Sequence, residues 1–240
     1  MRRKDYGIWQ DITWAEYLDN VKYVALGLNA LGVKYRDHVA IIGENRPEWL
    51  YSALGAVCAG GAWVGIYTTN PVPECKYVVE HSDAVVYICE DEEQLDKALA
   101  FRDQTPLLKK LICWEMEGLK HFKDPMFMSF DELLEMGKKI DKEKPDLFMQ
   151  LTQKAKPEDI AGIIYTSGTT GIPKAAMESH RSLIANTLQI KRWLPDIQEG
   201  REVTLMAIPL FHVYGMVAGM NLSIAAAAAL VMVPNPRDLD

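Results

Sequence analysis

Short apolar runs alternate with amphipathic segments along most of the chain. The apolar runs are bounded by glycine and polar residues, which is typical of strands buried in a sheet. In the first half the predicted strands are residues 39–42, 63–67, 84–89 and 110–114. Between them, apolar positions recur at helical spacing. The predicted helices are residues 13–31, 47–59, 74–81 and 92–101. This alternation, with short connections, predicts an α/β fold with a mostly parallel sheet flanked by helices.

The second half of the chain is less regular. Residues 115–157 are rich in charge, contain one predicted helix at 131–139, and are expected to cross the surface. The apolar run 160–164 predicts a strand that breaks into a polar loop. Ser179 is a suitable cap for the helix that follows it. The remaining predicted strands are residues 175–177, 203–207 and 230–233, and the remaining predicted helices are residues 180–194 and 214–226.

One segment has the length of a membrane span. Phe211 to Val233 carries no formal charge and is long enough to cross a bilayer. It also contains His212, Asn221 and two glycines, and its run of alanines is only weakly apolar. A helix and a strand buried in an α/β core are therefore favoured over a span.

Composition and charge narrow the class of protein. The chain has 240 residues, of which 49% are hydrophobic and 25% charged, enough for one large or two small cores. A net charge of -7 argues against a nucleic-acid partner, because phosphate neutralisation requires a basic face. The basic residues 2–4 are not followed by the apolar segment of a signal peptide, so a cytoplasmic protein is expected. Reduced thiols, without a metal knuckle or disulfide framework, are expected from the wide spacing of Cys58, Cys75, Cys89 and Cys113.

The stretch Tyr165–Lys174 carries the most specific chemistry in the chain. It holds four Ser or Thr hydroxyls, two glycines and a lysine directly after an apolar strand. Glycine lets backbone amides approach an anion, hydroxyls add donors and lysine adds a positive charge, so this composition suits polyphosphate. A Walker A loop requires Gly directly before Lys and Ser or Thr directly after it. Here two residues separate Gly171 from Lys174, and Ala175 follows the lysine, so that motif is excluded.

The segment Tyr165–Lys174 resembles the phosphate-binding motif of the adenylate-forming superfamily, which includes acyl-CoA synthetases, luciferases and the adenylation domains of peptide synthetases. Three other stretches resemble acyl-CoA synthetases, namely residues 12–18, 39–49 and 208–216. The string Asn45–Trp49 and the stretch Pro234–Asp238 are most similar to long-chain fatty-acid ligases. The resemblance implies the N-terminal portion of the large domain of such an enzyme.

In that family a carboxylic acid and ATP give an acyl adenylate and pyrophosphate, and the thiol of coenzyme A then displaces AMP. The resemblance therefore implies an acid–thiol ligase that uses ATP, Mg²⁺ and coenzyme A as cosubstrate. Charge builds on the phosphates as pyrophosphate leaves, so amides, hydroxyls, a lysine and a magnesium ion stabilise the transition state. By resemblance, Thr166 would help to hold magnesium, and Thr166 and Lys174 are the expected catalytic residues. The residues expected to bind the nucleotide are Thr166, Ser167, Gly168, Thr169, Thr170, Gly171 and Lys174. A solvated loop lysine is the alternative interpretation of Lys174.

An aromatic-histidine segment is the second candidate site. In similar proteins this segment lies at the acyl and adenylate pocket, which makes His212, Tyr214 and Gly215 the expected substrate-binding residues. The alternative for His212 is a core histidine whose ring is hydrogen-bonded to the backbone. The alternative for His180 is a residue at a helix N-terminus without a ligand role. The other three histidines, at positions 38, 81 and 121, carry no motif and are assigned no role.

Domain organisation follows from the same resemblance. Residues 1–240 are expected to form an incomplete N-terminal part of an adenylation domain with two interleaved α/β lobes, a lobe change near residues 195–205, and no C-terminal domain. Such a fragment is expected to be inactive alone. Its partners are small molecules, namely a fatty acid, ATP and coenzyme A; a homodimer and a peripheral membrane contact remain open. Two alternatives remain, adenylation of an aryl, short-chain or amino acid, and a non-catalytic nucleotide-binding fragment.

Overall fold

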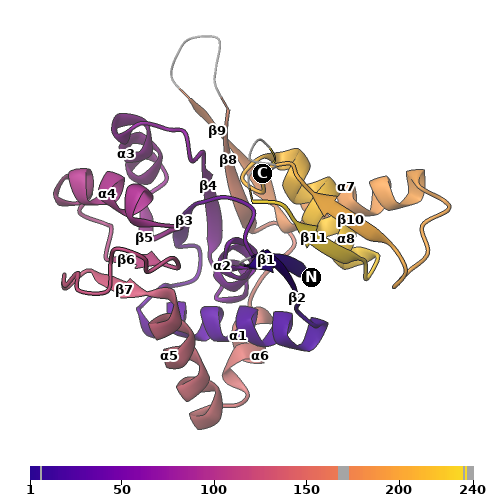
Figure 1. Cartoon of the computed structure of the whole chain (residues 1–240), viewed down its shortest axis with the longest axis horizontal. Coiled ribbons are helices and arrows are strands. Elements are labelled where there is room, and N and C mark those ends of the chain that lie inside the picture. Colours follow the sequence, from indigo (N-terminus) through magenta and orange to yellow (C-terminus); the bar gives the residue numbers. More distant parts are fainter. Residues whose placement is uncertain (6, 167–172, 235, 237–240) are drawn as a thin grey trace.

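The computed structural model describes residues 1–5, 7–166, 173–234 and 236. Two sheets form the framework (Figure 1). The strands of the first sheet are β3 (His38–Ile42), β4 (Ala62–Ile66), β5 (Ala84–Cys89), β6 (Lys110–Cys113), β7 (Phe127–Ser129), β8 (Ile160–Thr166) and β9 (Lys174–Ser179). The strands of the second sheet are β1 (Arg2–Asp5), β2 (Ile8–Asp11), β10 (Val203–Met206) and β11 (Ala229–Met232). The helices are α1 (Trp14–Ala30), α2 (Pro47–Cys58), α3 (Val72–His81), α4 (Glu92–Phe101), η1 (Arg102–Gln104), α5 (Phe130–Glu143), α6 (Leu147–Thr152), α7 (His180–Trp193), η2 (Gly215–Asn221) and α8 (Leu222–Ala225).

The first sheet has the order β7-β6-β5-β3-β4-β8-β9. Its strands pair in parallel except β8 and β9, which pair antiparallel. Every residue of β4 and β5 is buried, as expected for parallel strands covered on both faces. The predicted fold class, a mostly parallel sheet flanked by helices, is therefore confirmed.

Helices cover both faces of the first sheet and create two cores. Alternate residues of β3 point to opposite faces, so Val39 and Ile41 pack with α1, α2 and α5. Ala40 and Ile42 pack on the other face with α3 and α4. Helix α1 begins at a capping box between Thr13 and Glu16, as its sequence predicts.

The second sheet joins distant parts of the chain in the order β10-β11-β1-β2. Strand β1 pairs in parallel with β11, where Arg2 lies opposite Val231, and antiparallel with β2. The sequence did not predict β1, because its four residues, Arg-Arg-Lys-Asp, lack any apolar alternation. Met206 and Met232 of this sheet belong to the same apolar cluster as α1 and α2, so the two sheets share a core.

Two predicted elements need correction. The region 115–157 was predicted to contain one helix at 131–139, but it also forms β7 and α6, and its main helix α5 extends to Glu143. A capping box between Ser129 and Glu132 starts α5. The helix predicted at 214–226 is instead the π-helix η2 followed by one turn, α8. Apolar spacing over one or two turns does not distinguish a π-helix from an α-helix.

The apolar segment 211–233 thus consists of short helices and strand β11. Within the described parts of the chain, none of the helices combines the length and apolarity needed to traverse a bilayer. All four cysteines are free thiols, as expected.

Candidate functional site

The β8–β9 hairpin carries the two described residues of the predicted phosphate motif. Thr166 ends β8 and lies opposite Lys174, which begins β9. Both residues are exposed, at the loop end of the hairpin, which projects beyond the body of the sheet (Figure 1). The predicted residues Ser167, Gly168, Thr169, Thr170 and Gly171 lie outside the described residues. Their proposed contacts with phosphate stay predictions.

A cleft of about 630 Å³ lies where the carboxyl ends of β3 and β4 meet the segment after β10. Its lining residues are Glu44, Tyr67, Thr68, Thr69, Ile208, Pro209, Phe211, His212, Tyr214 and Pro236. Polar residues that follow buried parallel strands commonly form ligand sites at this edge of a sheet. The cleft therefore has two features of a ligand site. It lies at the carboxyl ends of parallel strands, and it includes the predicted aromatic-histidine segment.

The three predicted substrate-binding residues occupy different positions in this cleft. His212 and Tyr214 line it, and Tyr214 is 59% exposed. The Tyr214 backbone N–H donates to His212 Nδ1 at 3.2 Å, so the proton of the neutral ring lies on Nε2. Gly215 is buried, and a side chain there would collide with the carbonyl oxygen of Pro209. Gly215 thus permits close backbone packing and is absent from the cleft lining.

Asn45 fixes the segment that carries His212. This side chain is 1% exposed, and its Nδ2 donates to the carbonyl oxygens of Met206 and Ile208, each at 3.1 Å. Its Oδ1 accepts from Leu210 N–H at 2.9 Å. One residue at the end of β3 therefore holds the chain from β10 to the cleft. Sequence reasoning missed this role, because a polar residue shortly after a buried strand does not show which distant groups it contacts.

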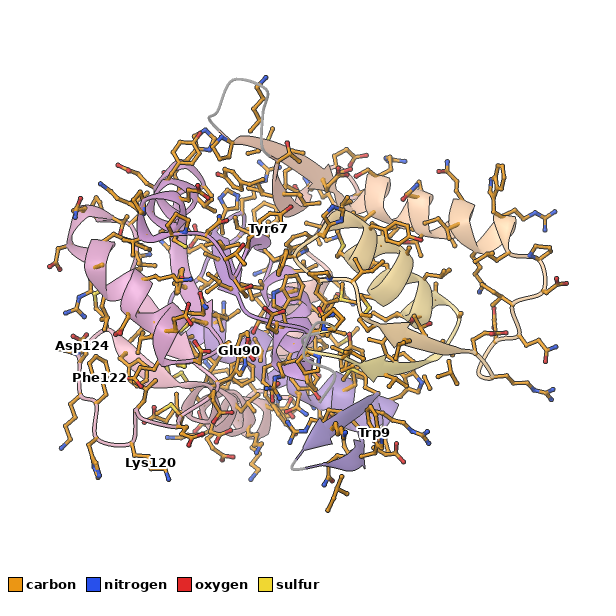
Figure 2. All side chains as sticks on the ribbon, turned by 45° about the horizontal axis from the view of Figure 1, so that its top comes forward. Trp9, Tyr67, Glu90, Lys120, Phe122 and Asp124 are labelled. Carbon is orange, nitrogen blue, oxygen red and sulfur yellow. The ribbon has the colours of Figure 1, made fainter. Side chains whose placement is uncertain are left out.

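A second polar network supports the floor of the cleft. Glu90 accepts from Glu44 N–H at 2.7 Å and from Arg46 Nε at 3.1 Å. Burial raises the pKa of Glu90, and these two donors act in the opposite direction. Thr68 donates its hydroxyl to Glu44 at 2.9 Å, which connects the network to the cleft wall. Figure 2 shows Glu90 below Tyr67 in that view.

Among the described residues, Thr166 is suited to act as a protein ligand of a magnesium ion. In nucleotide sites, Mg²⁺ is held by one or two protein oxygens together with phosphate oxygens and water. Thr166 offers such an oxygen at the exposed end of β8. Over the described part of the chain, no three His, Cys, Asp or Glu residues are grouped to hold a metal on their own. The arrangement suits a metal that enters with the nucleotide.

Two other hollows lie away from the hairpin end. An apolar groove of about 270 Å³ runs between α2, α7 and η2, with Met216, Met220 and Ile224 among its lining residues. A more open hollow of about 610 Å³ lies beside β7, in the region of Lys120, Phe122 and Asp124, apart from Tyr67 (Figure 2).

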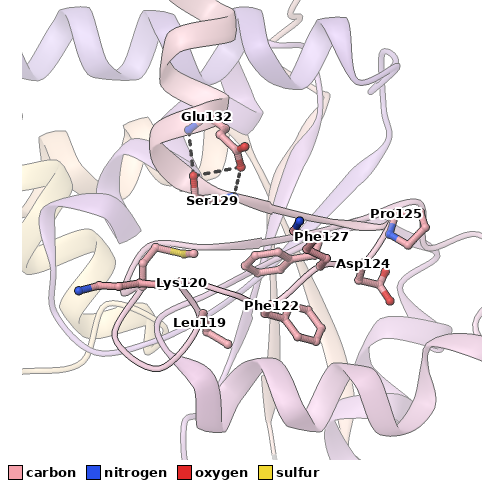
Figure 3. Close-up of a pocket in the computed structure, with 10 residues that line it drawn as sticks. Leu119, Lys120, Phe122, Asp124, Pro125, Phe127, Ser129 and Glu132 are labelled. Atoms are coloured by element: carbon pink, nitrogen blue, oxygen red, sulfur yellow. Dashed lines mark hydrogen bonds between the residues drawn. The ribbon is translucent and has the colours of Figure 1, made fainter.

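The acidic and hydroxyl groups of the hollow beside β7 have structural partners. Glu132 and Ser129 bond each other in the capping box of α5 (Figure 3). Asp124 accepts from Arg102 and from Met126 N–H. Because these groups stabilise local structure, this hollow is a weaker candidate site than the cleft.

A family model described as AMP-binding enzyme matches residues 3–240. The chain belongs to this AMP-binding enzyme family. Its predicted resemblance to the adenylate-forming superfamily is thereby confirmed.

Among curated members of the AMP-binding family, the chain is 34% identical to a long-chain-fatty-acid–CoA ligase, ACSBG2, from Xenopus laevis, over 85% of this chain and 27% of that protein. It is also 34% identical to the ligase ACSBG1 from Rattus norvegicus, over 88% of this chain and 29% of that protein. The ligase heimdall from Drosophila melanogaster is 30% identical, over 92% of this chain and 32% of that protein. The chain thus spans about a third or less of the length of these relatives.

Several solved structures share the fold of this chain. The anthranilate CoA ligase AuaEII, in complex with anthranoyl-AMP, superposes with a TM-score of 0.78 at 23% identity, over 94% of this chain and 40% of that chain. ATP-bound MatB from Rhodopseudomonas palustris gives a TM-score of 0.75 at 24% identity, over 94% and 41% of the two chains. The long-chain-fatty-acid–CoA ligase FadD1 from Archaeoglobus fulgidus gives 0.76 at 18% identity, over 97% and 43%.

Proposed function

We propose that the chain is the N-terminal part of a ligase that activates a long-chain fatty acid with ATP, giving acyl-AMP and then acyl-CoA. The observation that carries the proposal is the pairing of Thr166 and Lys174 at the loop end of the β8–β9 hairpin, in a chain of the AMP-binding family. This pairing puts a hydroxyl and a cation on either side of the predicted phosphate loop. The names of the curated relatives support the choice of a long-chain acid.

The proposed roles follow from electrostatics. Lys174 is a compact, flexible cation that can neutralise charge as it moves onto the leaving pyrophosphate. Thr166 contributes one oxygen toward Mg²⁺, and the metal adds positive charge against the phosphates when it is bound. The remaining motif residues from Ser167 to Gly171 are proposed to donate amide and hydroxyl hydrogen bonds to the phosphates.

The acid is proposed to lie in the cleft beside His212 and Tyr214. His212 carries its neutral-ring proton on Nε2, which is suited to donate to a carboxylate or phosphate oxygen. The acyl chain is proposed to bind in the apolar groove near η2, which includes Met216 and Met220, because flexible methionines adapt to apolar ligands. Gly215 is proposed to act by letting the segment pack closely.

The proposed domain organisation has two interleaved lobes within one incomplete domain. The two sheets support this division, because α7 leads from the first sheet to β10 of the second across residues 194–202. Dimerisation and peripheral contact with a membrane are proposals that rest on the family alone.

The proposal is tested in the complete ligase by ATP–pyrophosphate exchange driven by palmitate. Lys174→Ala is expected to lower the exchange rate by about 10²-fold or more, the size of effect seen when one transition-state donor is removed. Lys139→Ala, an exposed lysine on α5, is the matched control and should keep the parent rate. Equal rates for Lys174→Ala and the parent would exclude the proposed role.

The alternative acid class is separated by substrate choice. One structural neighbour binds anthranoyl-AMP, so an aryl acid is the specific competitor. Exchange driven by palmitate but not by benzoate, acetate or an amino acid would support the long-chain assignment, and the reverse order would replace it. Calorimetry of this chain with ATP against AMP tests the non-catalytic alternative. A pyrophosphate-release assay on the same chain tests its expected inactivity.

A further inference from the structure

Three aromatic rings lie close together near the loop end of the β8–β9 hairpin. Tyr77 and His81 are one turn apart on α3 and stack with ring centroids 5.1 Å apart. Tyr165 of β8 packs edge-on against both, at 6.2 Å from Tyr77 and 5.8 Å from His81. These three residues are called the aromatic cluster below. Tyr165 is the first residue of the predicted phosphate motif, whereas Tyr77 and His81 have had no role in the site described above.

Hydrogen bonds join the aromatic cluster to both strands of the hairpin. The Tyr77 hydroxyl donates to the carbonyl oxygen of Pro173 at 3.2 Å. The Tyr165 hydroxyl lies 2.8 Å from His81 Nδ1. Burial raises the pKa of Tyr165 to about 12, so this phenol keeps its proton at neutral pH. Helix α3 therefore holds β8 through one residue and the start of β9 through another.

The two anchored residues are adjacent to the two proposed phosphate ligands. Tyr165 directly precedes Thr166, and Pro173 directly precedes Lys174. Among the described residues, β9 is the last strand of the sheet and pairs with β8 alone, and its Met177 is 69% exposed. The Tyr77 hydroxyl adds a tie from a rigid helix to the residue where β9 begins.

We propose that Tyr77 is a positioning residue, which acts with His81 and Tyr165 to fix the separation and direction of Thr166 and Lys174 for binding a polyphosphate. This inference rests on the proposed function, because it assumes that Thr166 and Lys174 bind the phosphates of ATP. Its physical basis is preorganisation. A residue held in its bound geometry loses less freedom when the ligand arrives, so affinity rises without any new contact.

Tyr77→Phe tests the proposal, because it removes one hydroxyl and keeps the stacked ring. The readouts are the dissociation constant of inorganic tripolyphosphate with Mg²⁺, by titration calorimetry, and the melting temperature. Loss of one hydrogen bond is expected to weaken tripolyphosphate binding by between about twofold and tenfold. The melting temperature should stay close to that of the parent, since Tyr77 is only half-buried.

Tyr87→Phe is the matched control. Its hydroxyl also donates to a backbone carbonyl, that of Gln94 at 3.3 Å, but it lies between β5 and α4. This variant should bind tripolyphosphate with the parent affinity. His81→Phe keeps a ring against Tyr77 and removes the bond to Tyr165, and it should weaken binding by a smaller factor than Tyr77→Phe.

The outcomes separate this inference from the proposed function. Absence of tripolyphosphate and ATP binding by the parent chain would refute the phosphate site itself and the inference with it. Binding by the parent with an unchanged constant in Tyr77→Phe would overturn the positioning role and leave the phosphate site standing. A lower melting temperature with unchanged affinity would make Tyr77 purely structural. Unchanged affinity in His81→Phe would remove His81 from the proposal.

Discussion

The strands of the two sheets differ in how far they are buried. In the first sheet, every residue of β4 and β5 is buried, and the strands are covered on both faces by helices. In the second sheet, every residue of β2 is exposed, and Val203 and Leu205 of β10 are each 66% exposed. The central strands of the first sheet are held mainly by apolar packing on both faces. The second depends more on individual connections to the first.

The candidate site residues lie in two structurally different places. Thr166 and Lys174 are at the edge of the first sheet, where a rigid scaffold ends in an exposed hairpin. His212 belongs to the segment after β10, which Asn45 ties to the first sheet. A site assembled from both sheets is sensitive to whatever keeps them in register.

The largest effect is expected from Asn45→Ala, which removes the tie between the sheets. Three backbone groups, those of Met206, Ile208 and Leu210, lose their side-chain partner. The Met206 carbonyl keeps its hydrogen bond from Val233 N–H, whereas Leu210 N–H and the Ile208 carbonyl lose the partner that Asn45 supplies. An unsatisfied buried group costs about 1–3 kcal/mol, so we expect a loss of roughly 2–4 kcal/mol in unfolding free energy. Urea denaturation measures it.

Asn221→Ala is the control for that change. Within the described residues its side-chain amide makes one hydrogen bond, to the Met216 sulfur at 3.5 Å, so less than about 1 kcal/mol should be lost. Equal losses for the two asparagine variants would contradict the view that Asn45 joins the sheets.

A pair of glycine substitutions compares the packing of the two regions directly. A Cβ at Gly162 would overlap the Trp63 ring, which is fixed in the core of the first sheet. A Cβ at Gly219 would meet only the flexible end of Met206. Gly162→Ala should cost about 1–3 kcal/mol by overpacking, and Gly219→Ala should remain within about 1 kcal/mol of the parent. Thermal or urea unfolding that ranked them in the opposite order would show that the second region is the more rigid.

The same contrast explains which elements could be predicted from the sequence. Strands β3, β4 and β5 are apolar runs bounded by polar residues, so their local pattern carries the whole signal. Strand β1 has no such pattern, because it forms by pairing with β2 and with β11, the latter more than two hundred residues away in the chain. The π-helix η2 also escaped prediction, since its apolar spacing is compatible with an ordinary helix.

The candidate site was predictable to a similar extent. The motif Tyr165–Lys174 combines residues adjacent in sequence, so composition alone indicated phosphate chemistry. The aromatic-histidine segment was also found, and the structure puts His212 and Tyr214 in the cleft. Asn45 and Tyr77 were missed because their roles depend on partners 96 or more residues away. A local pattern does not encode such contacts.

Helix caps should show a smaller difference between the regions. Thr13 caps α1, which buries seven residues over the first sheet, and Ser179 caps α7, which buries two. Thr13→Ala should lower global stability by about 1 kcal/mol, with Thr13→Ser close to the parent. Ser179→Ala should mainly speed amide hydrogen exchange in the first turn of α7, because that helix is less tightly packed. A global loss as large in Ser179→Ala would contradict this ranking.

The smallest change of stability with pH near neutrality is expected from Asp159, the buried carboxylate directly before β8. It accepts hydrogen bonds from Tyr35, from Arg36 at 2.9 Å and from Lys156 N–H, and these donors lower its pKa to about 2. An unfolded aspartate has a pKa of about 3.9. The stabilisation is therefore complete above about pH 4 and is lost as the pH falls toward 2, because the folded form must then bind a proton against its donors.

Between pH 5 and 8, Asp159 should add no slope to the stability of the parent. The free energy of unfolding of the parent should fall between about pH 4 and 2. In Asp159→Asn this fall should be smaller, as measured by urea midpoints across that range. The exposed pair of Arg2 and Asp11 in the second sheet, 55% and 72% exposed, is the natural comparison, and Arg2→Ala should cost less than about 1 kcal/mol. The same pH dependence of stability in Asp159→Asn and the parent would show that this carboxylate does not connect β8 to the turn at Tyr35. The acid sensitivity of the first sheet would then come from other groups.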